Sequence, residues 1–349
     1  MNKVIIYAAV NTKIRALEKN FLKREDYLNI LRKKSVFDVA RYLKENTFYS
    51  KLLDEIRIDE NISRRDLEYV LKKNMIDNMD KLIYYFRDDY KEFIRFLYMK
   101  YEIEDLKILA RSIFNGIELE SLEKPFSFLG KYSKVNPERI FKSKSIQELI
   151  YSLEGSVFFE MLNPLLAHKI ENLFEFEMAL DMGYFNIIQS RKLKISPKDM
   201  KILKKWEGMV ADLYNIQWIY RGKKFYNLLP EELLNYSVNF GDKLSFRERK
   251  MMCYTKNLDE LYQIITNTIY GFLFKKEEMS RDIYMERRIN RFMYYKLKAL
   301  DRQFPLSIIQ TIDFVWSFEF EIRDIISILE AKRYGIPIEE SRKFLVKVA

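Results

Sequence analysis

Three short stretches of this sequence follow one pattern, and they decide its fold. They are Glu102–Leu106 (EIEDL), Asp212–Ile216 (DLYNI) and Glu321–Ile325 (EIRDI). Each has an acid, an aliphatic residue, any residue, Asp or Asn, and a second aliphatic residue. Their first residues are 110 and 109 positions apart. A pattern that recurs at one long period indicates copies of a single structural unit, so the sequence predicts three similar units.

A second pattern recurs with the same period. Thr47–Tyr49, Ser156–Phe158 and Thr268–Tyr270 each have a hydroxyl residue followed two positions later by an aromatic residue. Their spacings are 109 and 112 residues, and an aliphatic or aromatic residue lies ten positions before each hydroxyl. Two independent patterns with one period support the repeat more strongly than either pattern alone.

Glycine and proline residues indicate where one unit ends and the next begins. Gly116 and Gly222 each follow a stretch with helical spacing, and Pro137 and Pro230 lie in the segments after them. Glycine and proline are typical of the ends of helices and of the joints between them. We therefore predict helical repeat units at residues 1–116, 117–222 and 223–349.

The apolar residues within each unit have the spacing of an α-helix. In the third unit, Ile322, Ile325, Ile328 and Leu329 form one stripe of a helix with 3.6 residues per turn. No stretch alternates strictly between apolar and polar residues, and the chain has only 9 Gly and 7 Pro. Barrels and sandwiches need many tight turns, so the sequence predicts an all-α fold with little or no strand.

Acidic residues beside this stripe are the candidate interface or axis-lining residues. Glu102, Asp212 and Glu321 border the apolar stripe at equivalent places in the three units. Two interpretations remain open: each acid is satisfied locally by a Lys, an Arg or a helix N-terminus, or the acids line a shared axis or docking surface. Glu319 and Glu330 lie on the same terminal helix as Glu321. Glu330 is nine residues after Glu321 and therefore faces the opposite side.

The bulk composition limits the possible classes of protein. The net charge of +10 and the pI of about 9.2 indicate either a basic face for nucleic acid or anionic lipid, or a general excess of lysine. No run of five Lys or Arg occurs, which favours the second interpretation. No apolar run approaches the ~20 residues that cross a bilayer, and no convincing signal peptide is present. We therefore expect a soluble, cytoplasmic protein that meets a membrane only through a partner.

The sequence lacks the motifs of common catalytic and cofactor sites. No two glycines are closer than 14 residues, which excludes the G-x-G-x-x-G, P-loop and G-x-S-x-G motifs. His168 is the only histidine and Cys253 the only cysteine. We therefore predict no catalytic residue, no bound cofactor and no metal site, and a scaffold or adaptor rather than an enzyme.

With these features in place, the chain resembles the C subunit of the bacterial and archaeal V-type (A/V-type) rotary ATPases, the counterpart of the eukaryotic d subunit. The resemblance covers the whole chain and depends on the order and spacing of several stretches. These stretches are Tyr7–Ala16, Tyr42–Tyr49, Glu175–Phe185, Asp212–Ile216 and Phe318–Ile325. In the third unit the family often has Asn and Trp where this chain has Asp324 and Ser327, whereas the second unit keeps Asn215 and Trp218.

The resemblance implies a mechanical role in an ATP synthase or ATPase. Members of the family are all-helical and funnel-shaped, with three similar units around a pseudo-threefold axis. They belong to the rotor: they bind the foot of the central shaft, made of the D and F subunits, and the cytoplasmic face of the proteolipid ring in the membrane. Torque passes through them between ATP chemistry and proton or sodium translocation. The alternative that the sequence leaves open is a basic helical-repeat protein that binds nucleic acid.

Overall fold

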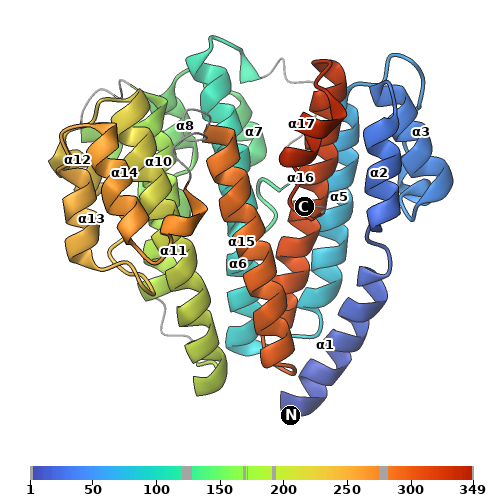
Figure 1. Cartoon of the computed structure of the whole chain (residues 1–349), viewed down its shortest axis with the longest axis horizontal. Helices are drawn as coiled ribbons and strands as arrows, with labels where there is room; N and C mark the ends of the chain where they lie inside the picture. The colour runs from blue at the N-terminus through green and yellow to red at the C-terminus, as the bar shows by residue number, and fades with distance from the viewer. Residues whose placement is uncertain are drawn as a thin grey trace. The chain divides into compact units, whose positions relative to one another are not determined.

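The computed structural model describes residues 3–119, 128–167, 170, 172–190, 194–274 and 282–347. Within these ranges the regular secondary structure is helical and includes no strand (Figure 1). The predicted all-α class is therefore confirmed. His168 lies outside the described residues.

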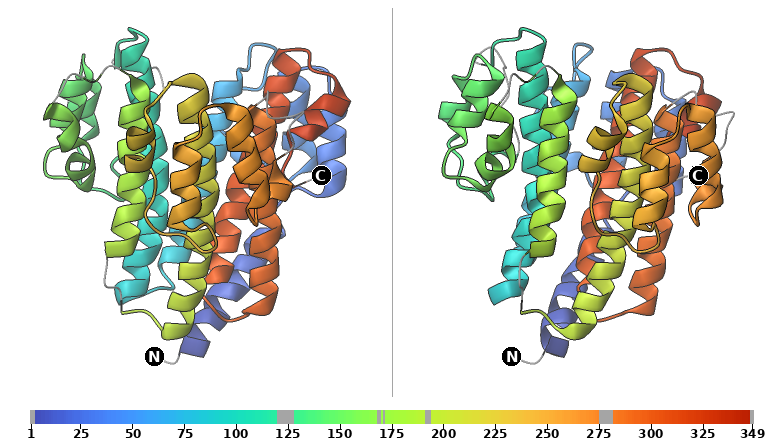
Figure 2. Two further views of the ribbon diagram at one scale, coloured as in Figure 1. Left: turned by 60° about the vertical axis from the view of Figure 1, so that its left-hand side comes forward. Right: turned by 90° about the vertical axis from the view of Figure 1, so that its left-hand side faces the viewer.

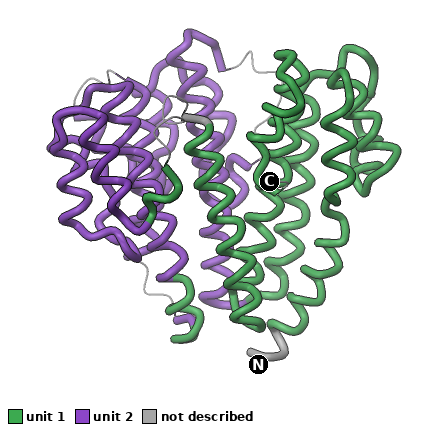
Figure 3. The backbone as a smooth tube through the Cα atoms, viewed as in Figure 1, with its two compact units in different colours: residues 1–86, 196–203, 270–349 green, residues 87–195, 204–269 purple. Residues whose placement is uncertain are grey.

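The chain divides into two compact units, shown in two colours in Figure 3. Unit 1 contains residues 1–86, 196–203 and 270–349, and unit 2 contains residues 87–195 and 204–269. This division reflects the density of contacts between residues, whereas the three repeat units are inferred from recurring sequence. The boundaries at residues 116 and 222, and the threefold repeat itself, stay predictions.

Unit 1 is built around one long buried helix, α16 (Ile309–Arg333). The other helices of unit 1 are α1 (Lys3–Glu18), α2 (Arg24–Arg32), α3 (Val36–Asn46), α4 (Ser50–Leu53), α5 (Arg64–Ile83), η3 (Gly271–Leu273), α15 (Asp282–Gln303) and α17 (Ile338–Lys343). Of these, α1, α3, α5, α15 and α17 pack against α16, and α5 lies beside α16 in Figure 1.

Polar residues are buried in α16 together with apolar ones. Phe314 and Ile325 are fully buried, and so are Glu321 and Asp324. Buried polar side chains must find their hydrogen-bond partners within the protein. The contacts of these acids therefore determine how unit 1 holds together.

Unit 2 contains a pair of long helices, α6 (Asp88–Phe114) and α10 (Leu173–Ser190), which lie side by side in both views of Figure 2. Its core contains Leu106, Leu149, Phe158 and Phe176. The other helices of unit 2 are α7 (Pro137–Phe141), α8 (Ile146–Ser152), α9 (Val157–Leu162), η2 (Asn163–Ala167), α12 (Pro230–Asn235), α13 (Phe246–Cys253) and α14 (Leu258–Asn267). The helix α11 (Pro197–Phe225) belongs to unit 2 from Lys204 onward.

The same N-cap recurs at α3, α8 and α14. Ser35, Ser145 and Asn257 each accept a hydrogen bond through the side-chain oxygen from the backbone N–H three residues later, at 3.1, 3.2 and 2.9 Å. A cap of this kind typically stabilises a helix by ~1 kcal/mol. The three caps are 110 and 112 residues apart, which is the period of the sequence patterns.

A matching contact follows each of these helices. The hydroxyl groups of Thr47, Ser156 and Thr268 donate hydrogen bonds to backbone carbonyls of the preceding turn, at 2.5, 2.6 and 2.7 Å. These are the hydroxyl residues of the second sequence pattern. That pattern therefore marks the turn after each of the three short helices.

Candidate functional site: the motif carboxylates

The first acid of each motif lies on a long helix and is completely buried. Glu102 on α6, Asp212 on α11 and Glu321 on α16 each have 0% of their surface exposed. The acid or amide three residues later is buried as well, with 3% exposure or less. Carboxylates are rarely buried unless they are paired or hydrogen bonded, so the partners of these side chains identify their role.

On α6, both motif acids bind backbone N–H groups of the following loop. Glu102 Oε1 accepts hydrogen bonds from the N–H groups of Tyr132 and Ser133. Asp105 Oδ2 accepts from the N–H groups of Phe128 and Leu129 at 2.8 and 3.1 Å. Burial raises the pKa of Glu102, and the backbone hydrogen bonds oppose this shift. The two acids fix the loop against the helix.

On α11, Asp212 collects three consecutive backbone N–H groups. Its Oδ2 accepts from Asp242, Lys243 and Leu244 at 3.1, 2.7 and 3.1 Å. Gly241 immediately precedes them, and a Cβ atom there would lie 1.9 Å from Asp212 Oδ1. The close approach of the carboxylate to this backbone therefore requires glycine.

The fourth residue of this motif, Asn215, binds both polar groups of one backbone position. Its amide donates to the carbonyl of Val238 at 3.0 Å, and its Oδ1 accepts from the N–H of Val238 at 2.7 Å. An amide side chain can satisfy both backbone groups because it carries a donor and an acceptor. The segment 238–244 is thus attached to α11 at both of its ends.

On α16, Glu321 joins segments from both ends of the chain. Its Oε2 accepts from the N–H of Leu22 at 3.0 Å and from Lys347 Nζ at 2.7 Å, and its Oε1 accepts from the hydroxyl of Tyr49 at 2.8 Å. Burial, together with the Glu321 charge, raises the pKa of Tyr49 well above its usual value. The hydroxyl therefore stays protonated and can donate.

Asp324 completes this group on α16. Its two oxygens accept from the N–H groups of Val346 and Lys347 at 2.7 and 2.9 Å. Burial raises the pKa of Asp324 to about 6, and the two backbone hydrogen bonds oppose that shift. The C-terminal segment is therefore bound to α16 through Asp324 and Glu321.

One contact is common to the three motifs. The side chain in the fourth position accepts a backbone N–H from a residue 22 to 24 positions later in the chain, in Asp105, Asn215 and Asp324 alike. The first acid makes a similar contact 30 to 32 positions later in Glu102 and Asp212. Glu321 differs because its partners are Leu22, Tyr27, Tyr49 and the side chain of Lys347.

These contacts bear on the two interpretations of the motif acids. The observed partners of Glu102, Asp212 and Glu321 belong to the chain itself, as the interpretation of local satisfaction requires. That interpretation anticipates Lys, Arg or a helix N-terminus, whereas most of the donors are loop N–H groups. A shared axis or docking surface lined by these acids stays a prediction.

The two remaining candidate residues lie nearer the surface. Glu319 is 18% exposed at its side chain and forms an ion pair with Arg323 at 2.9 Å. Glu330 is 29% exposed and pairs with Arg64 of α5 at 2.7 Å. Their role at an interface stays a prediction, and Arg64 is a partner that the sequence does not reveal.

A charge cluster around the buried side chain of Lys107 in unit 2 also escapes prediction from the sequence. Lys107 Nζ lies 2.5 Å from Asp181 on α10 and 3.0 Å from Glu104. Burial lowers the pKa of Lys107, but the two carboxylates outweigh burial and the pKa is raised. Burial raises the pKa of Asp181 to about 6. This pair connects α6 to α10, and the spacing of either helix alone does not reveal it.

The described ranges provide neither a metal site nor a membrane span. Within them, no group of three His, Cys, Asp or Glu residues is arranged to bind a metal ion. No helix in the part of the chain that the structure describes is both long and apolar enough to cross a membrane. Cys253 is buried, and burial raises the pKa of its thiol to about 11.

The fold and these contacts define an all-helical protein whose motif acids bind its own backbone. A family model described as "ATP synthase (C/AC39) subunit" matches residues 10–344, and the chain belongs to this family.

Similar proteins include three archaeal relatives, each named as the C subunit of an A-type ATP synthase. The one from Methanocaldococcus jannaschii is 23% identical over 98% of this chain and 86% of its own length. Those from Methanococcoides burtonii and Methanosphaera stadtmanae are each 22% identical over 97% of this chain, covering 94% and 88% of their own lengths. The predicted resemblance is confirmed.

Proposed function

We propose that the chain is a non-catalytic central-stalk subunit of a rotary ATP synthase. In this role it binds the shaft of D and F subunits and the membrane proteolipid ring, and it transmits torque during proton or sodium translocation. The family match over residues 10–344 supports this role, as do the relatives named as C subunits of A-type ATP synthases. The match favours a rotor component over the nucleic-acid-binding alternative.

The observation that carries the mechanical part of the proposal is the set of buried carboxylates on the long helices. A part that transmits torque must resist twisting of its helices against the loops that connect them. Hydrogen bonds to charged groups contribute roughly 1.5–3 kcal/mol each. Asp212 alone accepts three of them from consecutive residues, so the loop and helix move together.

The proposed location follows from the proposed partners. We place the chain on the cytoplasmic face of the membrane, attached peripherally through the proteolipid ring. Its binding to the ring and shaft would be through protein surfaces, because no described helix is suited to span the bilayer.

Reconstitution of the complex with and without this chain tests the proposal. Vesicles that contain the membrane ring and the ATP-hydrolysing part should form an ion gradient on ATP addition only when the chain is present. ATP hydrolysis itself should continue without it, because the chain supplies no catalytic group. Binding of the purified chain to the D–F shaft and to the ring is measured separately. Full ion pumping without the chain, or ATP hydrolysis by the chain alone, would contradict the proposal.

A further inference from the structure

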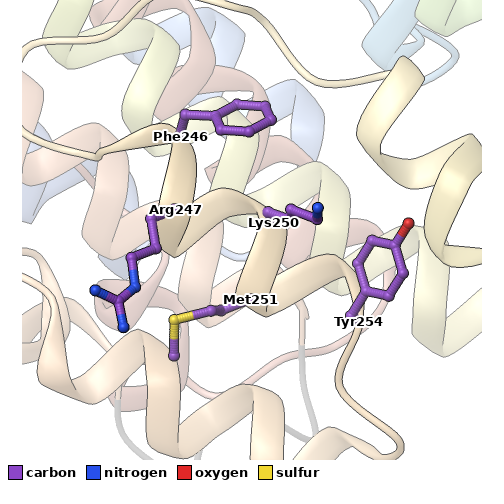
Figure 4. Close-up of a pocket in the computed structure, with 5 residues that line it drawn as sticks. All are labelled: Phe246, Arg247, Lys250, Met251 and Tyr254. Carbon is purple, nitrogen blue, oxygen red and sulfur yellow. The ribbon is translucent and has the colours of Figure 1, made fainter.

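The outward side of α13 carries large apolar side chains and two cations. We define the α13 face as Phe246, Arg247, Lys250, Met251 and Tyr254, which together line a surface pocket of about 390 Å³ (Figure 4). Phe246 is 56% exposed, and Met251 and Tyr254 are each 47% exposed. Single exposed apolar residues are ordinary, whereas a cluster that is continuous with charged residues is typical of a binding surface.

The spacing of these residues gives the face the shape of a helix-packing site. Phe246, Lys250 and Tyr254 follow one another at intervals of four residues, and Arg247 and Met251 form a parallel row. Rows at this interval are the ridges of a helix surface, and the groove between two of them accepts a ridge of another helix. The pocket of α13 is lined by these two rows.

The opposite side of α13 packs against the rest of unit 2, so the α13 face is held in place before any partner binds. Met252 and Cys253 are fully buried. The buried guanidinium of Arg249 donates to the carbonyl of Val238. Ser245 and Glu248 form a capping box at the start of the helix. A surface that is already rigid loses little conformational entropy on binding.

Within the described ranges, the cations of the face have no carboxylate partner. Among the described residues, Arg247 and Lys250 form no ion pair, and Lys250 Nζ lies 5.7 Å from the ring centre of Tyr254. Two carboxylates beside the face accept hydrogen bonds from neutral donors: Glu248 accepts from the N–H of Ser245, and Glu231 accepts from the hydroxyl of Tyr254. The face thus combines apolar side chains with two cations that form no ion pair among the described residues, and a complementary partner is apolar and supplies carboxylates to Arg247 and Lys250.

We propose that the α13 face binds an acidic amphipathic helix of a partner protein. Apolar residues of that helix fill the groove beside Phe246 and Met251, and its carboxylates pair with Arg247 and Lys250. A second copy of this chain is a poor occupant, because a symmetric contact would place like cations together. The proposal goes beyond the role in the central stalk and does not depend on the identity of the shaft or ring.

Two synthetic peptides of opposite charge test this inference. Each is a fluorescent helix of about 18 residues with Leu at positions i, i+3, i+4 and i+7, and the remaining positions carry mainly Glu in one peptide and mainly Lys in the other. Fluorescence anisotropy with the full chain should show that the Glu peptide binds at least tenfold more tightly than the Lys peptide. The double variant R247E/K250E should weaken the Glu peptide at least tenfold and strengthen the Lys peptide. F246A/M251A should weaken both peptides.

The matched control is K201E/K204E, which reverses two exposed lysines with the same spacing on α11. It changes the net charge equally and should leave the affinity of the Glu peptide within twofold of wild type. Equal loss in the control, or no loss in R247E/K250E, would overturn the proposal. Binding of anionic vesicles that depends on Arg247 and Lys250, without binding of the Glu peptide, would overturn it too and assign the face to a membrane surface. Failure of the wild-type chain to bind shaft or ring would refute the central-stalk role and leave the peptide result standing.

Discussion

Replacing Gly241 with alanine should separate Asp212 from the loop that it holds. The new Cβ would lie 1.9 Å from Asp212 Oδ1, whereas an ordinary van der Waals contact begins near 3.4 Å. The carboxylate must therefore move by more than an ångström, and it cannot then keep all three N–H groups at 2.7 to 3.1 Å. Losing one or two hydrogen bonds to a charged group costs about 2–5 kcal/mol.

Urea denaturation, followed by circular dichroism, measures this cost as a lower midpoint at an unchanged slope. A double-mutant cycle with D212A identifies its cause. In the D212A background the obstructing oxygen is absent, so G241A should cost less than about 1 kcal/mol. The reasoning is refuted if G241A is as stable as wild type, or if it costs the same in both backgrounds.

Three further changes test other parts of the structure. Glu207 has a buried Oε1 without a hydrogen-bond partner among the described residues, and burial raises its pKa to about 8. Because the pKa of Glu207 is higher in the folded than in the unfolded protein, the free energy of unfolding should fall as pH rises from about 4.5 to about 8, by at most ~1.4 kcal/mol per pH unit. E207Q should remove this slope in urea titrations at several pH values. K107M should cost about 1.5–3 kcal/mol by removing the cation that binds the half-buried carboxylate of Asp181, and K107M/D181L should recover part of this loss in the same titrations. Equal stability of K107M and wild type would show that the pair is not needed. E330K should cost about 0.5–1 kcal/mol of stability because it breaks the ion pair with Arg64, and it should weaken assembly with the shaft or ring in pull-down experiments. The control is R64E/E330K, in which the ion pair is restored with its charges exchanged. Normal assembly and pumping by E330K would leave Glu330 a purely structural residue.

The fold class could be predicted from the sequence because it depends on local patterns. The stripe of Ile322, Ile325, Ile328 and Leu329 specifies a helix wherever it occurs, and the N-caps at Ser35 and its counterparts act within one turn. The two compact units were not predicted, since unit 1 combines residues that lie far apart in the chain. Periodicity within a segment carries no information on which distant segment packs against it.

The candidate acids could be located from the sequence, but their partners could not. The recurring Asp or Asn in Asp105, Asn215 and Asp324 marks the position that binds backbone in each motif. Its donors are main-chain N–H groups, which every residue except proline carries and which therefore leave no sequence signature. Gly241 was one available signal, because a glycine 29 residues after Asp212 indicates a close backbone approach. Lys347 offered none, since nothing local distinguishes it from other lysines. Tyr49 belongs to the second recurring pattern, but that pattern does not identify Glu321 as its partner.

The bond between Leu22 and Glu321 also sets an order of events during synthesis of the chain. The two residues are 299 positions apart, and ribosomes add about 5–20 residues per second. The first helices therefore emerge on the order of 15–60 s before the helix that covers them. Unit 2 contains no residue beyond position 269, so it can fold in that interval. Meanwhile Val10 and Ile14 on α1, which are buried in the finished protein, lack the packing of α16, and a chaperone that holds apolar segments would protect them from aggregation.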